Sequence, residues 1–162
     1  MINEQDRIYL RRCVELAESA LAAGDEPFGS VLVSSNGKVL FEDHNHVAGG
    51  DHTQHPEFAI ARWAAQNMSP EERSVATVYT SGEHCPMCAA AHGWAGLGRI
   101  VYASSSKQLS AWLSELGARP SRVRPLSIGE VITDTVVDGP DEELAPQIRL
   151  LHVKLHTRER DK

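Results

Sequence analysis

The stretch of chain between residues 76 and 103 constrains the fold more than any other part of the sequence. Residues 76–80 and 99–103 are short β-rich runs, and Pro86 suits the first position of a helix that continues to about Ala95. A strand, a crossover helix and a second strand form a parallel pair with a right-handed connection. This stretch therefore predicts an α/β protein with parallel strands at its centre.

The part of the chain before residue 70 predicts a helix, a hairpin and a second helix. Asn3 is a good N-cap for the first helix, and Gly24 can end it. Asn36-Gly37 is a hairpin signal between two β-rich runs. The expected elements are a helix over residues 3–23, strands over 30–34 and 38–42, and a helix that begins at residue 56 and ends before residue 69.

Beyond residue 104 the pattern is weaker, but segment 140–162 predicts a closing helix. One face of this helix carries four apolar side chains, which are Leu144, Ile148, Leu151 and Leu155. Before it, residues 107–116 can form a helix and residues 123–137 are weakly β-like. We therefore predict one domain over residues 1–162, folded as a three-layer α/β/α sandwich with a mixed five-stranded sheet.

The composition of the 162 residues limits the partners and the location of the chain. Sixteen Lys and Arg against 22 Asp and Glu give a formal net charge of −6, which disfavours nucleic acid as a partner. The charged N-terminus has no apolar signal region, and no run approaches the ~20 apolar residues of a membrane span. We therefore expect a cytoplasmic location and no membrane contact.

Three cysteines form an odd set that does not indicate a disulfide framework. Cys13 falls beside the helical stripe of Leu10, Val14, Ala17 and Leu21, so we expect an inert core thiol there. The other two form Cys85-Pro86-Met87-Cys88, which suits metal or redox chemistry.

Two short motifs each place a proline directly after a potential zinc ligand, at the predicted start of a helix. They are His55-Pro56-Glu57 and Cys85-Pro86-Met87-Cys88. One histidine and two cysteines supply the three ligands of a catalytic zinc site, whose fourth position is left for water. Helix N-termini favour the negative charge that develops when this water ionises. Glu57 can then act as the general base that carries the proton.

Two other interpretations of the cysteines stay open. A Cys-x-x-Cys pair near a strand-helix-strand unit can be a thioredoxin-type redox pair, although that would leave His55-Pro56-Glu57 unexplained, and here His84 precedes the motif in place of an aromatic residue. A purely structural zinc site would need a fourth protein ligand, which His84 or His92 could supply.

The joint pattern of His-x-Glu and, about thirty residues later, Cys-x-x-Cys resembles the signature of the zinc-dependent cytidine/deoxycytidylate deaminase superfamily. The likeness covers roughly residues 5–105 and fits the guanine and nucleobase deaminase branch, which also contains tRNA adenosine deaminases. It implies a cytidine deaminase-like fold, catalysis by Glu57, a homodimer, and one Zn²⁺ per subunit. The implied zinc ligands are His55, Cys85 and Cys88.

The resemblance also implies residues that contact the substrate. Phe28 belongs to a run that resembles the family's first strand, and Asn45 resembles the asparagine that holds the substrate ring. Trp94 matches guanine deaminases, with core or subunit-interface packing as the alternative. Glu143 could reach the substrate from the C-terminal region, or could be an N-terminal charge of the last helix. His84 stands where the family usually has proline, which affects the rim of the pocket.

These features favour hydrolytic removal of an amino group from a small free heterocycle of the guanine, cytosine, aza-cytosine or s-triazine type. Asn45-His46-Val47 lacks the glutamate with which cytidine deaminases grip a ribose, so a free base is favoured over a nucleoside. The basic cluster of Arg119, Arg122 and Arg124 is interpreted as a solvated loop. A tRNA adenosine deaminase and a non-enzymatic zinc-stabilised module remain as alternatives.

Overall fold

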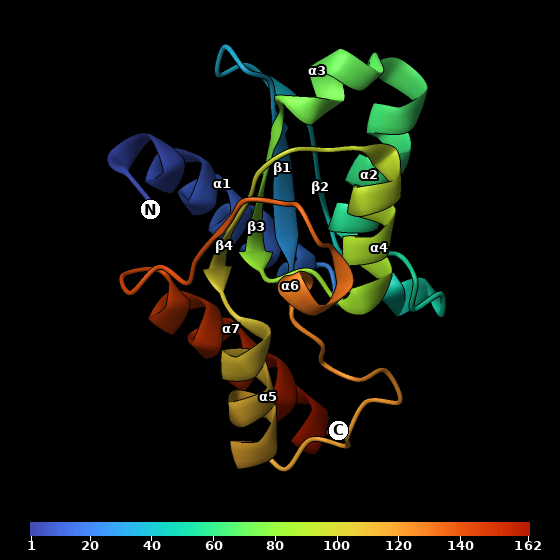
Figure 1. Cartoon of the computed structure of the whole chain (residues 1–162). Helices are drawn as coiled ribbons and strands as arrows, with labels where there is room; N and C mark the ends of the chain where they lie inside the picture. The colour runs from blue at the N-terminus through green and yellow to red at the C-terminus, as the bar shows by residue number, and fades with distance from the viewer.

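The computed structural model describes all 162 residues and contains one five-stranded sheet in the order β2-β1-β3-β4-β5 (Figure 1). The strands are β1 (Gly29–Val33), β2 (Val39–His44), β3 (Thr77–Gly82), β4 (Ile100–Ser104) and β5 (Val137–Asp138). β1 pairs antiparallel with β2 and β3, whereas β3, β4 and β5 run parallel. The predicted mixed five-stranded sheet is confirmed.

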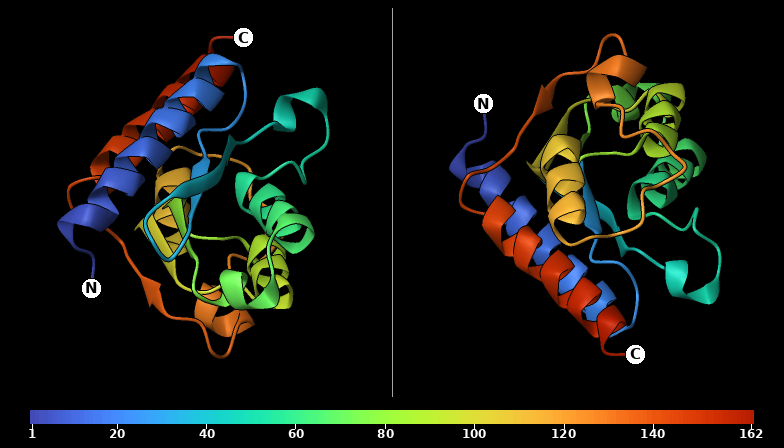
Figure 2. Two further views of the ribbon diagram at one scale, coloured as in Figure 1. Left: turned by 90° about the horizontal axis from the view of Figure 1, so that it is seen from above. Right: turned by 90° about the horizontal axis from the view of Figure 1, so that it is seen from below.

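Helices cover both faces of this sheet, as Figure 2 shows. They are α1 (Glu4–Ala22), α2 (Pro56–Asn67), α3 (Pro70–Ser74), α4 (Pro86–Ala95), α5 (Ser106–Glu115), α6 (Ile128–Val131) and α7 (Ala145–Arg160), with a 3-10 turn η1 (Val47–Gly49). α1 and α7 lie side by side on one face, and α2 and α4 lie on the opposite face. One apolar cluster joins α1 and α7 to the sheet and a second joins α2 to it, so the predicted α/β/α layering is confirmed. None of these helices has both the length and the apolar character needed to cross a membrane.

α1 shows why the predicted helices form where they do. The Asn3 side chain accepts from the Asp6 N–H at 2.9 Å, and the Asp6 carboxylate accepts from the Asn3 N–H at 3.0 Å, which completes a capping box. The predicted stripe is buried, and Cys13 lies in it with no exposed surface. A Cβ on Gly29 would lie 2.4 Å from that of Leu16, so β1 begins directly against α1.

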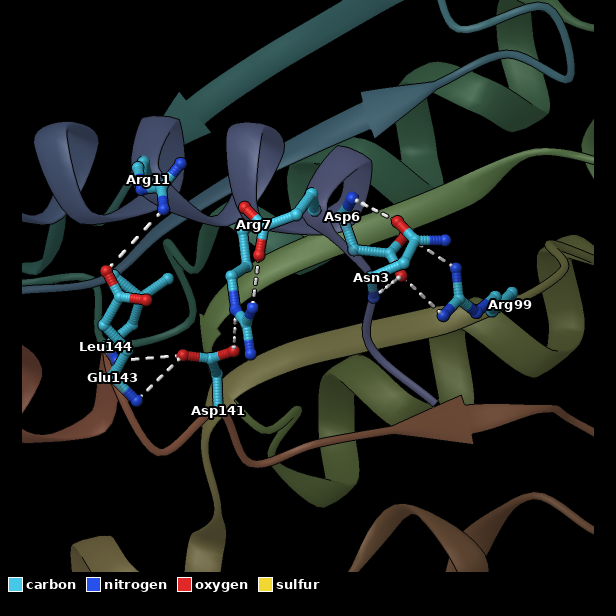
Figure 3. Close-up of polar contacts among 9 residues, drawn as sticks. Asn3, Asp6, Arg7, Arg11, Arg99, Asp141, Glu143 and Leu144 are labelled. Atoms are coloured by element: carbon cyan, nitrogen blue, oxygen red, sulfur yellow. Dashed lines mark hydrogen bonds and ion pairs between the residues drawn. The ribbon is translucent and has the colours of Figure 1, made fainter.

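A polar network fixes the N-terminal half of α1 to the sheet and to α7 (Figure 3). Arg99, the residue directly before β4, donates to both carboxylate oxygens of Asp6, at 2.8 and 3.0 Å. Arg7 donates to Asp141 at 2.9 Å, and Asp141 accepts from the N–H groups of Glu143 and Leu144 at 3.0 Å each. Asp141 therefore orders the turn that leads into α7.

Three features outside the central stretch differ from what the sequence predicted. The weakly β-like residues 123–137 form a loop and the short helix α6, because Ser127 and Glu130 make a capping box, and only β5 follows as a strand. The helix α3 was not predicted, although Ser69 and Glu72 form a capping box there too. The closing helix, expected over residues 140–162, spans Ala145–Arg160, because Asp141 holds the residues before it in a turn.

Candidate metal centre and active site

The predicted metal ligands lie at the N-termini of the neighbouring helices α2 and α4. His55 is the N-cap residue of α2 and Cys85 is the N-cap residue of α4, and a proline follows each at the first helical position. Neither side chain caps its own helix, so both are free to bind a ligand. Cys88, one turn into α4, is fully buried and faces the same point.

The three ligand atoms have the separations that a tetrahedral zinc ion requires. The Cys85 and Cys88 sulfurs are 3.6 Å apart, and His55 Nδ1 lies 3.6 Å from the first and 3.5 Å from the second. At ordinary zinc bond lengths, two sulfurs lie about 3.8 Å apart and a sulfur and a nitrogen about 3.6 Å. The residues therefore fit one zinc ion. They form a group of three, which leaves a coordination position open.

The three ligand side chains lie so close together that they shift one another's pKa values. Hydrogen bonding with Cys85 raises the pKa of His55 to about 9. Hydrogen bonds with Cys88 and His55 lower the pKa of Cys85 to about 4, against the effect of its burial. The neighbouring Cys85 sulfur and burial raise the pKa of Cys88. A bound metal must displace protons here, so acid weakens its binding.

Glu57, the second residue of α2, is a buried carboxylate near this group, and its charge helps to raise the pKa of Cys88. Its Oε1 lies 2.8 Å from the Thr80 hydroxyl and 3.1 Å from the Ser30 hydroxyl. Burial raises the pKa of Glu57, although the nearby His55 and the Thr80 hydrogen bond oppose this. A carboxyl group with a raised pKa next to a metal site suits proton transfer near neutral pH.

Sequence patterns did not reveal the two hydroxyls that hold Glu57. Ser30 and Thr80 come from β1 and β3 and are register partners in the sheet, 2.8 Å apart through their oxygens. The sequence gives no direct signal for this pairing. It follows only from the antiparallel register of the two strands, which places both side chains on one face.

We expect Thr80→Val to lower turnover by roughly tenfold, because a charge-assisted hydrogen bond to Glu57 is lost while the shape of the side chain is kept. Steady-state kinetics on the variant and measurement of its metal content check this. Thr80→Ser retains the hydroxyl and should restore most of the activity. Equal losses in Thr80→Val and Thr80→Ser would show that Thr80 acts through packing alone.

Asn45 and Phe28, two of the four predicted substrate residues, contact each other. The Asn45 N–H donates to the Phe28 carbonyl at 3.0 Å. Asn45 is buried, and its Oδ1 accepts from the Val47 N–H at 3.0 Å, whereas its amide nitrogen forms no hydrogen bond within the chain. The Asn45 amide nitrogen is therefore available to a ligand.

The other two predicted substrate residues lie on the surface. Trp94 is 92% exposed on α4, so its interpretation as core packing of this chain is wrong. Glu143 forms an exposed ion pair with Arg11 of α1 at 3.6 Å, as Figure 3 shows. It lies just before α7, whose N-cap residue Leu144 has no side-chain cap, and it is Asp141 that accepts from the N–H groups of this turn. No contact in the structure joins either residue to the His55 group.

His84 and His92, the predicted alternatives for a fourth ligand, pack against each other instead. Their rings are perpendicular, with centroids 5.4 Å apart, and both side chains are buried. His92 Nε2 bonds the Gly98 carbonyl at 2.7 Å, while both ring nitrogens of His84 have no partner. Neither histidine joins the group of His55, Cys85 and Cys88.

Two residues that sequence reasoning missed lie near the predicted site. Glu26 has a pKa raised mainly by burial, with the charge of His55 opposing the shift, so the two side chains are electrostatic neighbours. His152 of α7 is buried, packs edge-on against the Phe28 ring at 5.2 Å, and has a pKa lowered by burial to about 4. The signal for His152 was its place beside Leu151 on the apolar face of the closing helix.

One surface hollow lies elsewhere, at the end of the sheet where β3 begins. Its walls include Thr77, Gly93, Gly98 and Arg99, and it contains none of the predicted site residues. The chemistry of the donor set, and not this hollow, therefore locates the candidate site.

A mixed sheet flanked by two adjoining helix N-termini that carry one histidine, two cysteines and a buried glutamate is the arrangement found in zinc-dependent deaminases. Residues 3–104 match the family described as the cytidine and deoxycytidylate deaminase zinc-binding region. The chain belongs to this family.

Several curated proteins are similar to this chain over more than half of its length. A probable cytosine deaminase of Schizosaccharomyces pombe is 31% identical over 147 residues, which are 91% of this chain and 87% of the relative. A guanine deaminase of Bacillus subtilis is 36% identical over 59% of this chain and 62% of its own length. A tRNA-specific adenosine deaminase of Haemophilus influenzae is 32% identical over 67% of this chain and 64% of its own length.

Solved structures support the same fold. The guanine deaminase of Nitrosomonas europaea superimposes with a TM-score of 0.68 at 20% identity, covering 97% of this chain and 86% of that protein. A crystal structure of a mutant protein in complex with 8-azaguanine gives a TM-score of 0.71 at 19% identity, covering 94% of this chain and 85% of that one. These likenesses confirm the predicted cytidine deaminase-like architecture.

Proposed function

We propose that this protein is a zinc-dependent aminohydrolase that removes the exocyclic amino group of a small free nucleobase or related heterocycle. One observation supports the proposal most strongly. The ligand atoms of His55, Cys85 and Cys88 have the separations that a zinc ion requires, and the buried carboxylate of Glu57 lies near them. Guanine, cytosine, aza-cytosine and s-triazines share an amino-bearing carbon beside a ring nitrogen, so one site chemistry can serve them all.

The reaction adds water to the carbon that bears the amino group and releases ammonia, leaving a carbonyl. Zn²⁺ held by His55, Cys85 and Cys88 would supply Lewis acidity and lower the pKa of water toward ~7. Glu57 accepts a proton from the attacking water and delivers it to the adjacent ring nitrogen. A second proton, from the hydroxyl that has been added, then passes through Glu57 to the amino group as the C–N bond breaks.

The hydrogen bonds of Glu57 suit this double proton transfer. The Ser30 and Thr80 hydroxyls both contact Oε1, which leaves Oε2 to exchange protons with the substrate. For binding, we propose that the Asn45 amide pairs with the ring and that Phe28 forms an apolar wall beside it. The free amide nitrogen of Asn45 and the half-buried ring of Phe28 support these roles.

A free base is preferred over RNA in this proposal. The net charge of −6 opposes binding of a phosphate backbone, and the basic cluster of Arg119, Arg122 and Arg124 lies on an exposed loop.

We also propose a cytoplasmic location, which the sequence composition suggests, and a homodimer, which the family resemblance suggests. The exposed indole of Trp94 is compatible with a subunit contact, which analytical ultracentrifugation would test.

Ammonia release by the zinc-loaded protein over a panel of substrates tests the proposal. The panel contains free bases, triazines, the matching nucleosides and a tRNA anticodon stem-loop. We expect turnover of one or more free bases and little of the RNA. Turnover of the stem-loop alone would assign the protein to the tRNA adenosine deaminases, and no turnover of any compound would favour a non-enzymatic zinc module.

A further inference from the structure

A second group of potential metal ligands lies outside the proposed active site. Asp25 belongs to the connection between α1 and β1, His44 ends β2, and His46 follows two residues later. One ligand atom from each of the three lies within 4.8 Å of the other two. The two imidazole rings face each other with centroids 4.4 Å apart. None of these residues belongs to the His55 group.

The hydrogen bonds of the two histidines leave one ring nitrogen of each free to bind a cation. His44 Nδ1 lies 2.8 Å from the Asn45 carbonyl oxygen, which can only accept, so Nδ1 carries the hydrogen and Nε2 keeps its lone pair. His46 Nε2 lies 2.9 Å from a carboxylate oxygen of Asp43, so Nδ1 keeps its lone pair. Histidines that bind metals almost always donate their second nitrogen in this way.

Asp25 completes the group with a carboxylate that is also held in place. Its Oδ1 accepts from the Ala48 N–H at 2.9 Å, which leaves Oδ2 free, and the residue is only 7% exposed. In a closed site, donor nitrogens and oxygens lie about 3.3 Å apart. The His46 side chain is half exposed, so it can move to close the remaining distance.

We infer that Asp25, His44 and His46 form a second cation site, which binds a divalent transition metal such as Zn²⁺ or Co²⁺. Two imidazoles and one carboxylate suit these ions better than Ca²⁺ or Mg²⁺, which prefer oxygen ligands alone. The bound ion links the connection between α1 and β1, which contains Asp25, to the end of β2 and the segment that follows it. Because His44 and His46 flank Asn45, the cation stabilises the segment that presents this amide.

Titration of the metal-stripped full-length protein with Co²⁺, followed by equilibrium dialysis with Zn²⁺, tests the inference. We expect two ions per chain. Only one of them should show the intense near-ultraviolet charge-transfer band of cobalt bound to thiolate, because the second site has no sulfur. Cys85→Ser should lose this band and keep the second ion.

Three variants examine the second site itself. Asp25→Asn and His46→Gln should each bind one ion per chain and keep the thiolate band. Asp43→Asn should weaken the second ion by about 10–100-fold, because His46 loses its orienting partner. His52→Gln, which changes an exposed histidine of the same loop, is the matched control and should still bind two ions.

A single ion per chain in the unaltered protein would overturn the inference, as would two ions in both Asp25→Asn and His46→Gln. Since the His46 side chain is half exposed, His46→Gln should fold normally, and circular dichroism would check this. Binding of the second ion without any thiolate band would contradict the proposed active site and leave this inference standing. The two proposals therefore fail separately.

Discussion

Replacing Glu57 with glutamine should lower turnover by ~10²–10⁴-fold and leave the zinc content unchanged. Glutamine has the same shape and can still accept hydrogen bonds from Ser30 and Thr80. It cannot accept and return a proton, which is the step that we propose for Glu57. Steady-state kinetics and metal analysis on the same preparation measure both quantities.

The matched control for this variant is Glu71→Gln, which makes the same chemical change on an exposed residue of α3. It should retain full activity. If Glu57→Gln kept more than a tenth of the turnover, another group would have to carry the protons. If it lost its zinc, its inactivity would say nothing of proton transfer, and Glu57 would instead be needed to hold the metal site.

Asp6→Ala should lower the free energy of unfolding by about 3 kcal/mol, because it removes the buried carboxylate that accepts two hydrogen bonds from Arg99 and leaves Arg99 with Asp138 alone. The Tyr79 hydroxyl also loses its acceptor, and α1 loses half of its capping box. For a chain of this size the unfolding midpoint should fall by roughly 6–12 °C. Urea unfolding at pH 7 measures the change, and Asp134→Ala, on an exposed residue, should alter it by less than about 0.5 kcal/mol.

The same network predicts a pH dependence. Burial alone would raise the pKa of Asp6, but the hydrogen bonds from Arg99, the Asn3 N–H and Tyr79 together lower it. A lowered pKa in the folded state contributes stability above the unfolded pKa of about 4 and loses it as the pH falls through the folded value. The difference between Asp6→Ala and the unaltered protein should therefore shrink below pH 4. A constant difference down to pH 2 would contradict this assignment.

The central part of the fold could be predicted because its signals are local. Asn3, Pro56 and Pro86 mark helix starts by chemistry that acts within one turn, and the strand-helix-strand run dictates a parallel pair. The grouping of the candidate metal ligands could be predicted for the same reason, because His55 and Cys85 each stand directly before a helix-starting proline.

The remaining parts depend on contacts between distant segments. Ser30 and Thr80 reach Glu57 only through strand register, and His152 reaches Phe28 only through the docking of α7. Residues 123–137 have no clear hydrophobic periodicity, and their β-branched residues favour a strand. The capping residue Ser127, which marks the start of α6, was therefore not recognised in the sequence. Trp94 is exposed because it lies on the face of α4 that points away from the sheet. The sequence of a short apolar helix does not show which of its faces will be buried.

Zinc add-back to the metal-stripped protein, with a free base as substrate, tests the central claim most directly. The account predicts no turnover without metal, then a rise in proportion to added zinc until the site of His55, Cys85 and Cys88 is filled, and no recovery in Cys85→Ser. Full turnover by the stripped protein, or restored turnover in Cys85→Ser, would contradict it.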